Sequence, residues 1–209
     1  MAGSDGSDPL PTIREAFPRT VRLVASARLR EAVLAPLADT PDDLILLAEI
    51  EGATSGPLVA EERRLGALDH AELVHRVQHA HFINASFAYP KPRVAMRFNP
   101  ADRGAWYAAL NFETSLAKVG FNLTQALADA GDFNALVEYG ELLASMAGVF
   151  VDLRGRTDHS SLDPDPAIGY AAGNIVAAQA RVEGHNGIIY PSVRHEGGTC
   201  IAALWPNVV

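Results

Sequence analysis

Two clearly bounded helical patterns in the second half of the chain constrain its fold most. The first runs from Phe112 to Ala130, where apolar side chains recur on one face, and Gly131 follows its last residue. The second follows Asp165, which is suited to cap a helix, opens at Pro166 and ends at Gly184. Strand-like segments lie before, between and after these helices. This order predicts an α+β domain with a mixed sheet rather than a regular alternation of strand and helix.

The strand-like segments are rich in β-branched and aromatic residues and are separated by prolines and glycines. Residues 82–100, together with 105–111, predict two or three short strands. Residues 135–155 are ambiguous because GELLASMAG also fits a helix, but the valines and aromatic residues around it favour strands. Two further strands are predicted near the end of the chain, at 187–190 and 200–204.

The first part of the chain is predicted to be largely helical. Helices are expected at Leu23–Ala38, at Asp42–Ala53 and at Asp69–His81. Residues 1–12 are rich in Gly, Ser, Asp and Pro, a composition that predicts a mobile tail. With 209 residues, the chain is long enough for one well-packed domain, which is expected to span residues 13–209.

The charge of the chain limits the partners that it can bind. Its formal net charge is −8 at pH 7, which opposes binding to nucleic acid and to anionic membranes. No segment shows the pattern of an export signal or the roughly 18 apolar residues of a membrane span. The one cysteine, Cys200, lies in an apolar run and is expected to pack in the core, so no disulfide is predicted. A cytoplasmic protein is expected.

The stretch NGIIYPSVRHEGGTC, residues 186–200, combines a buried strand with polar groups at its end. The strand breaks at Pro191, and Ser192 and Arg194 follow in front of two glycines. A hydroxyl and a guanidinium beside backbone without side chains are typical of a binding site, but the same pattern occurs in ordinary turns. The residues around Ser192 do not have the spacing of a nucleophile elbow, so a hydrolase triad is not predicted.

A second stretch, RFNPADRGAWYAAL from Arg97 to Leu110, has a similar character. Arg97 and Asn99 leave a predicted strand at a proline, and Trp106 and Tyr107 begin the next strand. An arginine can hold phosphate oxygens with two hydrogen bonds, and an aromatic ring offers a face to a planar base. The alternative is a surface hairpin with solvated arginines and core aromatic residues.

Other common sites are not predicted. The histidines at 70, 75, 79 and 81 do not follow a zinc-protease spacing, and no carboxylate lies at a matching offset, so no metal site is expected. The glycines form neither a P-loop nor the glycine motif of the usual dinucleotide-binding fold.

Taken together, these stretches resemble the RES-domain toxins, which are encoded beside an Xre-type antitoxin. The resemblance implies a compact relative of the ADP-ribosyltransferase fold that cleaves its substrate NAD at the nicotinamide–ribose bond. ADP-ribose would then pass to a protein side chain, to water or to phosphate. The segments that carry the resemblance are RLVAS from Arg22, RFNPADRGAWYAAL from Arg97, ETSLAKV from Glu113, VDLRG from Val151, LDPDPAIGYAAG from Leu162 and GIIYPSVRHEGGTCIAAL from Gly187.

The resemblance also assigns roles to single residues. Arg22 and Arg97 would hold the phosphates of NAD. Tyr107 would pack against the nicotinamide half, and Ser192 would form a hydrogen bond with the nicotinamide or its ribose. Arg97 and Ser192 are therefore expected on the walls of one cavity. The expected NAD-binding residues are Arg22, Arg97, Asn99, Tyr107, Ser192 and Arg194.

The sequence departs from the family pattern at one catalytic position. Cleavage of the glycosidic bond builds positive charge on the ribose, which a carboxylate is suited to stabilise. The family's glutamate is expected in a pattern like ETALAEV, whereas this chain has ETSLAKV, with Lys118 in that place. An ammonium beside a developing cation has the wrong sign. Asn122 also replaces a residue that is often histidine in the family.

Three explanations are open for Lys118. Glu113 could replace the glutamate, although five residues along a helix separate their directions by about 140°. The glutamate could be less necessary in this branch, or the chain could be a detuned form, natural or engineered. We favour weakened chemistry with an otherwise intact NAD pocket. The predicted catalytic residues are Arg97, Tyr107, Lys118 and Ser192.

Two classes of function follow. The first is an NAD-consuming toxin that transfers ADP-ribose to a protein, with NAD glycohydrolase or phosphorylase activity as the alternative reaction. The second is a binding module that keeps the fold and the antitoxin-binding surface but catalyses little. The expected partner is an Xre-type antitoxin that blocks the pocket and shields Arg97 and Ser192 from NAD. A protein acceptor of ADP-ribose is a further expected partner, and direct binding to nucleic acid or to a membrane is not expected.

Overall fold

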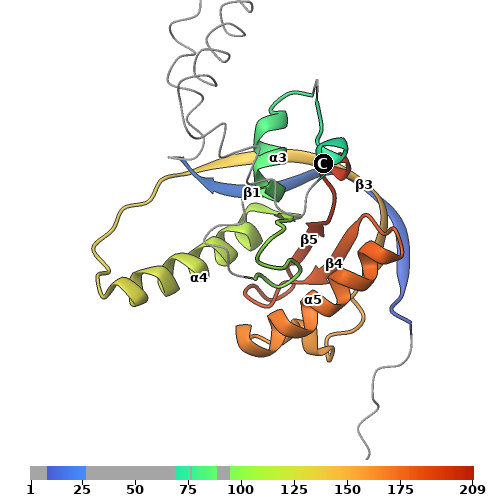
Figure 1. Ribbon diagram of the computed structural model, residues 1–209. Coiled ribbons are helices and arrows are strands. Elements are labelled where there is room, and N and C mark those ends of the chain that lie inside the picture. Colours follow the sequence, from blue (N-terminus) through green and yellow to red (C-terminus); the bar gives the residue numbers. More distant parts are fainter. Residues whose placement is uncertain (1–8, 27–68, 76, 89–94) are drawn as a thin grey trace, which may run out of the picture.

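Five strands form a closed barrel, in the spatial order β1 (Thr12–Ala25), β2 (Trp106–Ala109), β5 (Thr199–Ala203), β4 (Gly187–Pro191) and β3 (Tyr139–Asp152) (Figure 1). The computed structural model describes residues 9–26, 69–75, 77–88 and 95–209. Strands β3 and β4 are parallel, whereas the other neighbouring pairs are antiparallel. The fold is therefore α+β with a mixed sheet, which confirms the predicted class.

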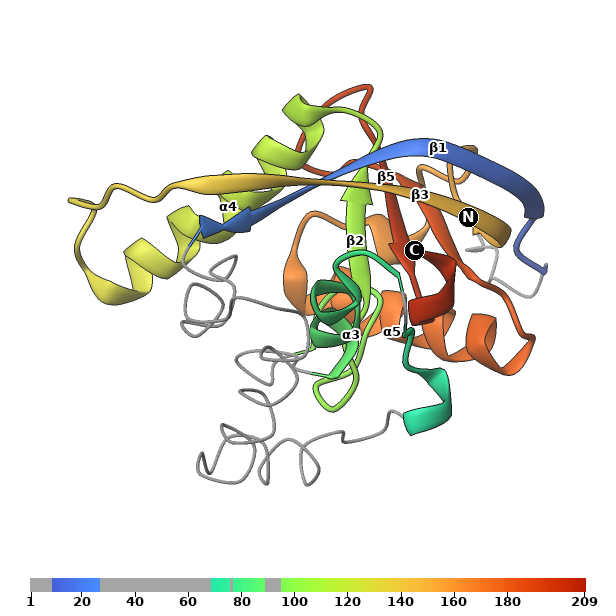
Figure 2. The same cartoon turned by 90° about the horizontal axis from the view of Figure 1, so that it is seen from above.

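The two long strands β1 and β3 form an antiparallel ribbon that runs across the molecule (Figure 2). Their pairing extends from Thr12, opposite Val151, to Ala25, opposite Tyr139. The helix predicted from Leu23 is wrong for residues 23–25, because they form the end of β1. These residues are extended because they pair with β3, which is distant in the chain. The periodicity of a local sequence does not reveal a distant strand partner. Residues 27–38 of that prediction, and the helix predicted at 42–53, lie outside the described residues.

The two helices with the clearest sequence signals have the predicted bounds. α4 (Phe112–Ala130) is capped by the side chain of Asn111 and is followed by Gly131, which has a left-handed φ of 69°. α5 (Pro166–Val182) is capped by Asp165, whose side chain accepts a hydrogen bond from the first turn. Among the described residues, no helix is both long and apolar enough to cross a membrane.

The segment before β2 differs from the prediction. A helix is expected at Asp69–His81, but the structure has a single 3-10 turn there, η3 (His70–Glu72). The next helix, α3 (Ala80–Ala88), includes the last two residues of that predicted helix, and from Phe82 on it covers positions that are predicted as strand. His79 has a φ of 59°, a left-handed conformation that interrupts a helix, and α3 begins at the following residue. Phe87 anchors α3 because its side chain is fully buried against the barrel.

Strands β4 and β5 are buried on both faces. Ile189 and Ile201 belong to a core cluster that contains residues from all five strands. Ile188 and Ala202, which point the other way, belong to a second cluster with α5. The predicted strands at 187–190 and 200–204 are thus confirmed, as is the strand preference for residues 135–155, most of which form β3.

Candidate active site

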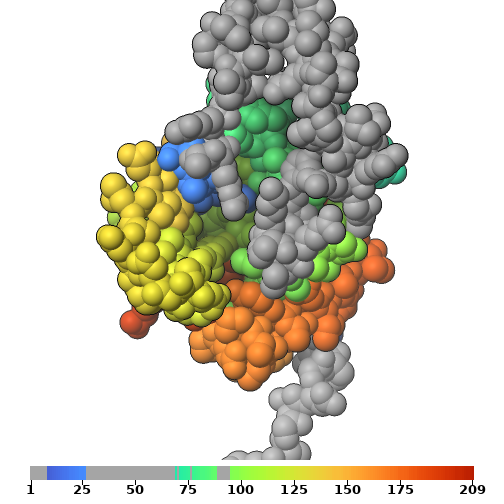
Figure 3. Space-filling model, turned by 60° about the vertical axis from the view of Figure 1, so that its left-hand side comes forward, coloured from blue at the N-terminus to red at the C-terminus, as the bar shows by residue number. Residues whose placement is uncertain are grey.

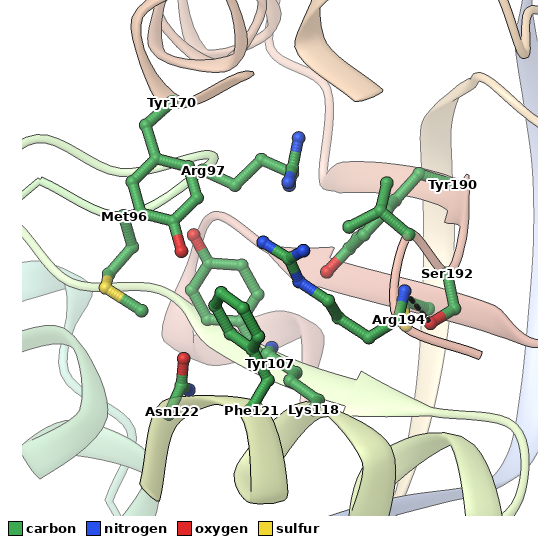
Figure 4. A pocket seen from close by; sticks show the side chains of 12 residues that line it. Met96, Arg97, Tyr107, Lys118, Phe121, Asn122, Tyr170, Tyr190, Ser192 and Arg194 are labelled. Carbon is green, nitrogen blue, oxygen red and sulfur yellow. Dashed lines mark hydrogen bonds between the residues drawn. The ribbon is translucent and has the colours of Figure 1, made fainter. Parts of the chain in front are cut away.

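A pocket opens between α4, α5 and the loop that joins β4 to β5 (Figure 4). The space-filling view shows the surface hollowed between α4 and α5 (Figure 3). The empty space of the pocket, with its open mouth included, is about 450 Å³. Arg97 and Ser192 both line it, which confirms that these two segments meet in one cavity. The lining residues are Met96, Arg97, Tyr107, Lys118, Phe121, Asn122, Tyr170, Tyr190, Ser192, Val193, Arg194 and Cys200.

Arg97 is buried in the wall of the pocket, with a relative exposure of 6%. Its Nη1 donates hydrogen bonds to the carbonyl oxygens of Ser161 and Asp163, the latter at 3.0 Å. α5 approaches this side chain closely at Gly169, where a Cβ would overlap with the guanidinium. The guanidinium is therefore held in one orientation.

Tyr107, on β2, offers its ring rather than its hydroxyl to a ligand. The hydroxyl donates to Asn99 Oδ1 at 2.8 Å and accepts from the N–H of Phe98 at 2.9 Å. Burial raises the pKa of the Tyr107 phenol well above its usual range. Asn99, a predicted NAD-binding residue, is not among the lining residues, and its observed contact is with Tyr107.

Lys118 reaches the pocket from α4. Its Nζ is buried and lies 3.8 Å from the centroid of the Tyr107 ring, a cation–π distance. No hydrogen-bond acceptor among the described residues contacts this nitrogen. Burial lowers the pKa of Lys118 to about 7; the Cys200 thiol opposes this shift, and the cations Arg22 and Arg97 add to it. The amine is thus partly neutral at neutral pH.

The free energy of unfolding of the wild-type protein is expected to rise between pH 7 and pH 9. Replacing Lys118 by methionine is expected to make this rise smaller. The pKa of Lys118 is lower in the folded than in the unfolded protein, so the unfolded chain binds more protons in this range. The free energy of unfolding therefore rises with pH, by on the order of 1–2 kcal/mol from this group. Urea unfolding of both proteins at pH 7, 8 and 9 measures the difference, and parallel profiles would contradict a shifted pKa at Lys118.

Three other residues from the sequence analysis lie near the pocket. Glu113 is exposed in the first turn of α4 and does not line the pocket, so it does not take the place of the missing glutamate. Asn122 lines the pocket with an exposed side chain. Arg22, on β1, lies with its Cζ 4.5 Å from the centroid of the Trp106 ring and is not among the lining residues. Its contact with NAD phosphates stays a prediction.

Ser192 begins the loop between β4 and β5. Its Oγ accepts hydrogen bonds from the backbone N–H groups of Arg194 at 3.3 Å and His195 at 3.1 Å. This is the local turn chemistry that the sequence also allows, and it leaves the hydroxyl its own proton as a donor. His195 in turn ties the loop to α4, because its Nδ1 lies 2.8 Å from Thr114 Oγ1. Ser192 therefore both stabilises the turn and lines the pocket.

Arg194 bridges the pocket. Its Nη2 donates to the carbonyl oxygen of Pro164 at 2.7 Å, and its Cζ lies 3.5 Å from the centroid of the Phe121 ring on α4. Burial, and secondly the neighbouring Arg97, lower the pKa of Arg194. The side chain therefore links the β4–β5 loop to α4 and to the segment that leads into α5, and Figure 4 shows it close to Phe121.

Sequence reasoning missed several lining residues. Tyr170 lies on α5, and its ring centroid is 5.4 Å from the Arg97 guanidinium. Phe121 follows Lys118 by one helical turn, a spacing that places the two on the same face of α4. This spacing was a usable signal, whereas the position of Tyr170 depends on how α5 packs. Cys200, predicted as a core residue, is buried and also lines the pocket. The residues not singled out from sequence are Met96, Phe121, Tyr170, Tyr190 and Val193.

The charges of the lining residues have one sign. Arg97, Lys118 and Arg194 are present, and the lining contains no Asp or Glu. Aromatic rings come from all the walls. Cations and aromatic rings in one lining suit a ligand that combines anionic groups with a planar ring. The aromatic lining residues are Tyr107, Phe121, Tyr170 and Tyr190.

The fold and the pocket define a small α+β protein with a cationic, aromatic-lined ligand site. The model of the RES-domain family matches residues 73–209. The chain belongs to the RES-domain family, which is associated with NAD-related toxin function, and this confirms the resemblance seen in the sequence. A search of curated proteins found no match. β1 lies before the matched residues, although it pairs with β3 inside them.

Proposed function

We propose that this protein is the toxin of a type II toxin–antitoxin pair and that it cleaves NAD and transfers ADP-ribose to a protein acceptor. One observation carries the proposal: Arg97 and Tyr107 from one segment and Ser192 from a second, distant one line a single cationic and aromatic pocket. Membership of the RES-domain family supports NAD as the substrate. The proposal includes an ADP-ribosyltransferase-like fold and a cytoplasmic location.

Different side chains of the pocket would bind different parts of NAD. Arg97, fixed by two carbonyl groups, is suited to hold a phosphate of NAD, and Arg194 offers a second cation across the pocket. The Tyr107 ring packs against the nicotinamide half. Its hydroxyl is occupied by Asn99 and by the backbone, so Tyr107 orients the substrate and does not transfer a proton. Ser192 donates a hydrogen bond from its hydroxyl to the nicotinamide or to the ribose.

In the proposed reaction, the bond between ribose C1′ and the pyridine nitrogen breaks, and its electron pair leaves with nicotinamide. C1′ becomes oxocarbenium-like, and a nucleophile of the acceptor attacks it and loses a proton. Orientation of NAD by Arg97 and Ser192 favours this step. The ammonium of Lys118 opposes it, because positive charge develops on the substrate in the same pocket. The reaction is therefore slow in this chain.

A second candidate function is a binding module with little catalysis. Lys118 favours it, since the described pocket has no carboxylate to stabilise the developing cation. NAD glycohydrolase and phosphorylase activities are variants of the first proposal that differ in the acceptor, water or phosphate.

Nicotinamide release from NAD tests the proposal directly. Chromatography of the reaction should show slow release by the wild-type protein, and mass spectrometry of a candidate acceptor should show the addition of one ADP-ribose. Free ADP-ribose without a modified protein indicates hydrolysis, and phosphorylated ADP-ribose indicates phosphorolysis. Binding of NAD without release supports the binding module. A protein that neither binds nor cleaves NAD contradicts the proposed enzyme and leaves only a module that binds the antitoxin.

The proposed partner is an Xre-type antitoxin that inserts a segment into the mouth of the pocket. Asn122 is exposed there and Arg194 crosses the opening, so a bound segment would cover the route of NAD. A saturating amount of antitoxin is expected to abolish NAD binding in titration calorimetry. Unchanged NAD affinity in the saturated complex would show that the antitoxin acts elsewhere.

A further inference from the structure

The ammonium of Lys118 is the part of the pocket that the proposed reaction does not use. Its Nζ is buried, contacts the face of the Tyr107 ring at 3.8 Å and has no hydrogen-bond acceptor among the described residues. Buried charged groups in proteins are as a rule paired, because their removal from water is costly. A cationic ligand group beside this ammonium would add to that cost, whereas a neutral group would not.

Two neighbouring arginines add to the positive charge of the pocket around Lys118. Arg97 and Arg194 line the same pocket, and Arg97 lies close enough to lower the pKa of both Lys118 and Arg194. No Asp or Glu is among the lining residues. The pocket is therefore a positive site in a chain whose formal net charge is −8.

The cations are also held in place before a ligand binds. Arg97 and Arg194 each donate to main-chain carbonyl groups of the segment that leads into α5. Lys118 rests on the ring of Tyr107. Charges that are fixed in this way discriminate strongly between ligands, because they cannot move away from a group of the wrong sign.

We propose that the pocket selects nucleotides by charge and binds ADP-ribose and NADH more tightly than oxidised NAD. This inference rests on the proposed function, because it concerns the same site. NAD and NADH share the diphosphate, but only the oxidised nicotinamide ring carries a positive charge, and ADP-ribose lacks the ring. Lys118 thus repels the ring of NAD, while the attraction of the diphosphate to the arginines is the same for all three ligands.

The expected preference is large enough to measure. One unit charge about 5 Å from another, at an effective dielectric constant of about 20, changes a binding constant by on the order of a hundredfold. Water and salt at the open mouth weaken this interaction. We therefore expect NAD to bind at least about tenfold more weakly than NADH.

Titration calorimetry of the wild-type protein with NAD, NADH and ADP-ribose at pH 6.5 tests the inference, with nicotinamide release followed in the same samples. At this pH most of Lys118 is protonated, because its pKa is about 7. Lys118→Met should bring the affinities for NAD and NADH to within about threefold, and Lys118→Glu should reverse their order. Arg19→Met is the control, since it removes one charge from an exposed side chain on β1. Urea unfolding verifies that each variant is folded.

The outcomes separate the two proposals. Equal affinities of the wild-type protein for NAD and NADH would overturn this inference and leave the proposed function standing. A preference for NADH that persists in Lys118→Met would also overturn it, because another group would then be responsible. If none of the three compounds binds, the proposed function fails, and this inference fails with it.

Discussion

Replacing Lys118 by glutamate is expected to raise the rate of NAD cleavage by on the order of a hundredfold. The substitution exchanges the ammonium, whose nitrogen is buried, for a carboxylate at the position where the resemblance leads us to expect the family's glutamate. Arg22 and Arg97 lie close enough to shift the pKa of Lys118, so they would also keep the new carboxylate ionised. A carboxylate near the ribose stabilises the positive charge that develops at C1′. The formation of nicotinamide under single-turnover conditions measures this rate, because the dissociation of products then does not limit it.

Lys118→Gln is the matched control for this experiment. It removes the ammonium without adding a carboxylate, so it should raise the rate much less than Lys118→Glu. If the two variants are equally fast, relief of repulsion is the main effect and a carboxylate is not needed in this branch. If Lys118→Glu is no faster than the wild-type protein, Lys118 does not attenuate the reaction.

Replacing Arg97 by methionine is expected to lower the affinity for NADH at least about a hundredfold and to destabilise the fold by about 2–4 kcal/mol. The affinity falls because the fixed cation for the phosphates is lost. The stability falls because the carbonyl groups of Ser161 and Asp163 lose their donor in a buried place. Titration calorimetry gives the first quantity, and urea unfolding gives the second.

Arg97→Lys separates the two effects. It keeps the charge but loses the planar fork, whose Nη1 contacts two carbonyl groups and whose remaining N–H groups would bind a phosphate, so it should recover more of the stability than of the affinity. Wild-type affinity for NADH in a folded Arg97→Met protein would show that Arg97 is a structural residue and would remove it from the phosphate site.

Local chemistry explains the parts of the fold that the sequence predicts well. The caps at Asn111 and Asp165 and the left-handed Gly131 mark helix ends through interactions within a few residues. The buried strands near the C-terminus are continuous apolar runs, because both of their faces are covered. In the candidate site, the resemblance to the RES-domain toxins identified Arg97, Tyr107, Lys118, Ser192 and Arg194, all of which line the pocket.

The sequence by itself therefore determined the two long helices, the buried strands and the chemical types of the site residues, since these depend on neighbours in the chain. Only the tertiary structure decided that β1 pairs with β3, that Asn99 lies outside the pocket lining and accepts a hydrogen bond from Tyr107, and that the Nζ of Lys118 is buried. The reason is that strand pairing and burial are set by groups far apart in sequence. Neither a residue's pattern nor its type shows which distant groups will surround it.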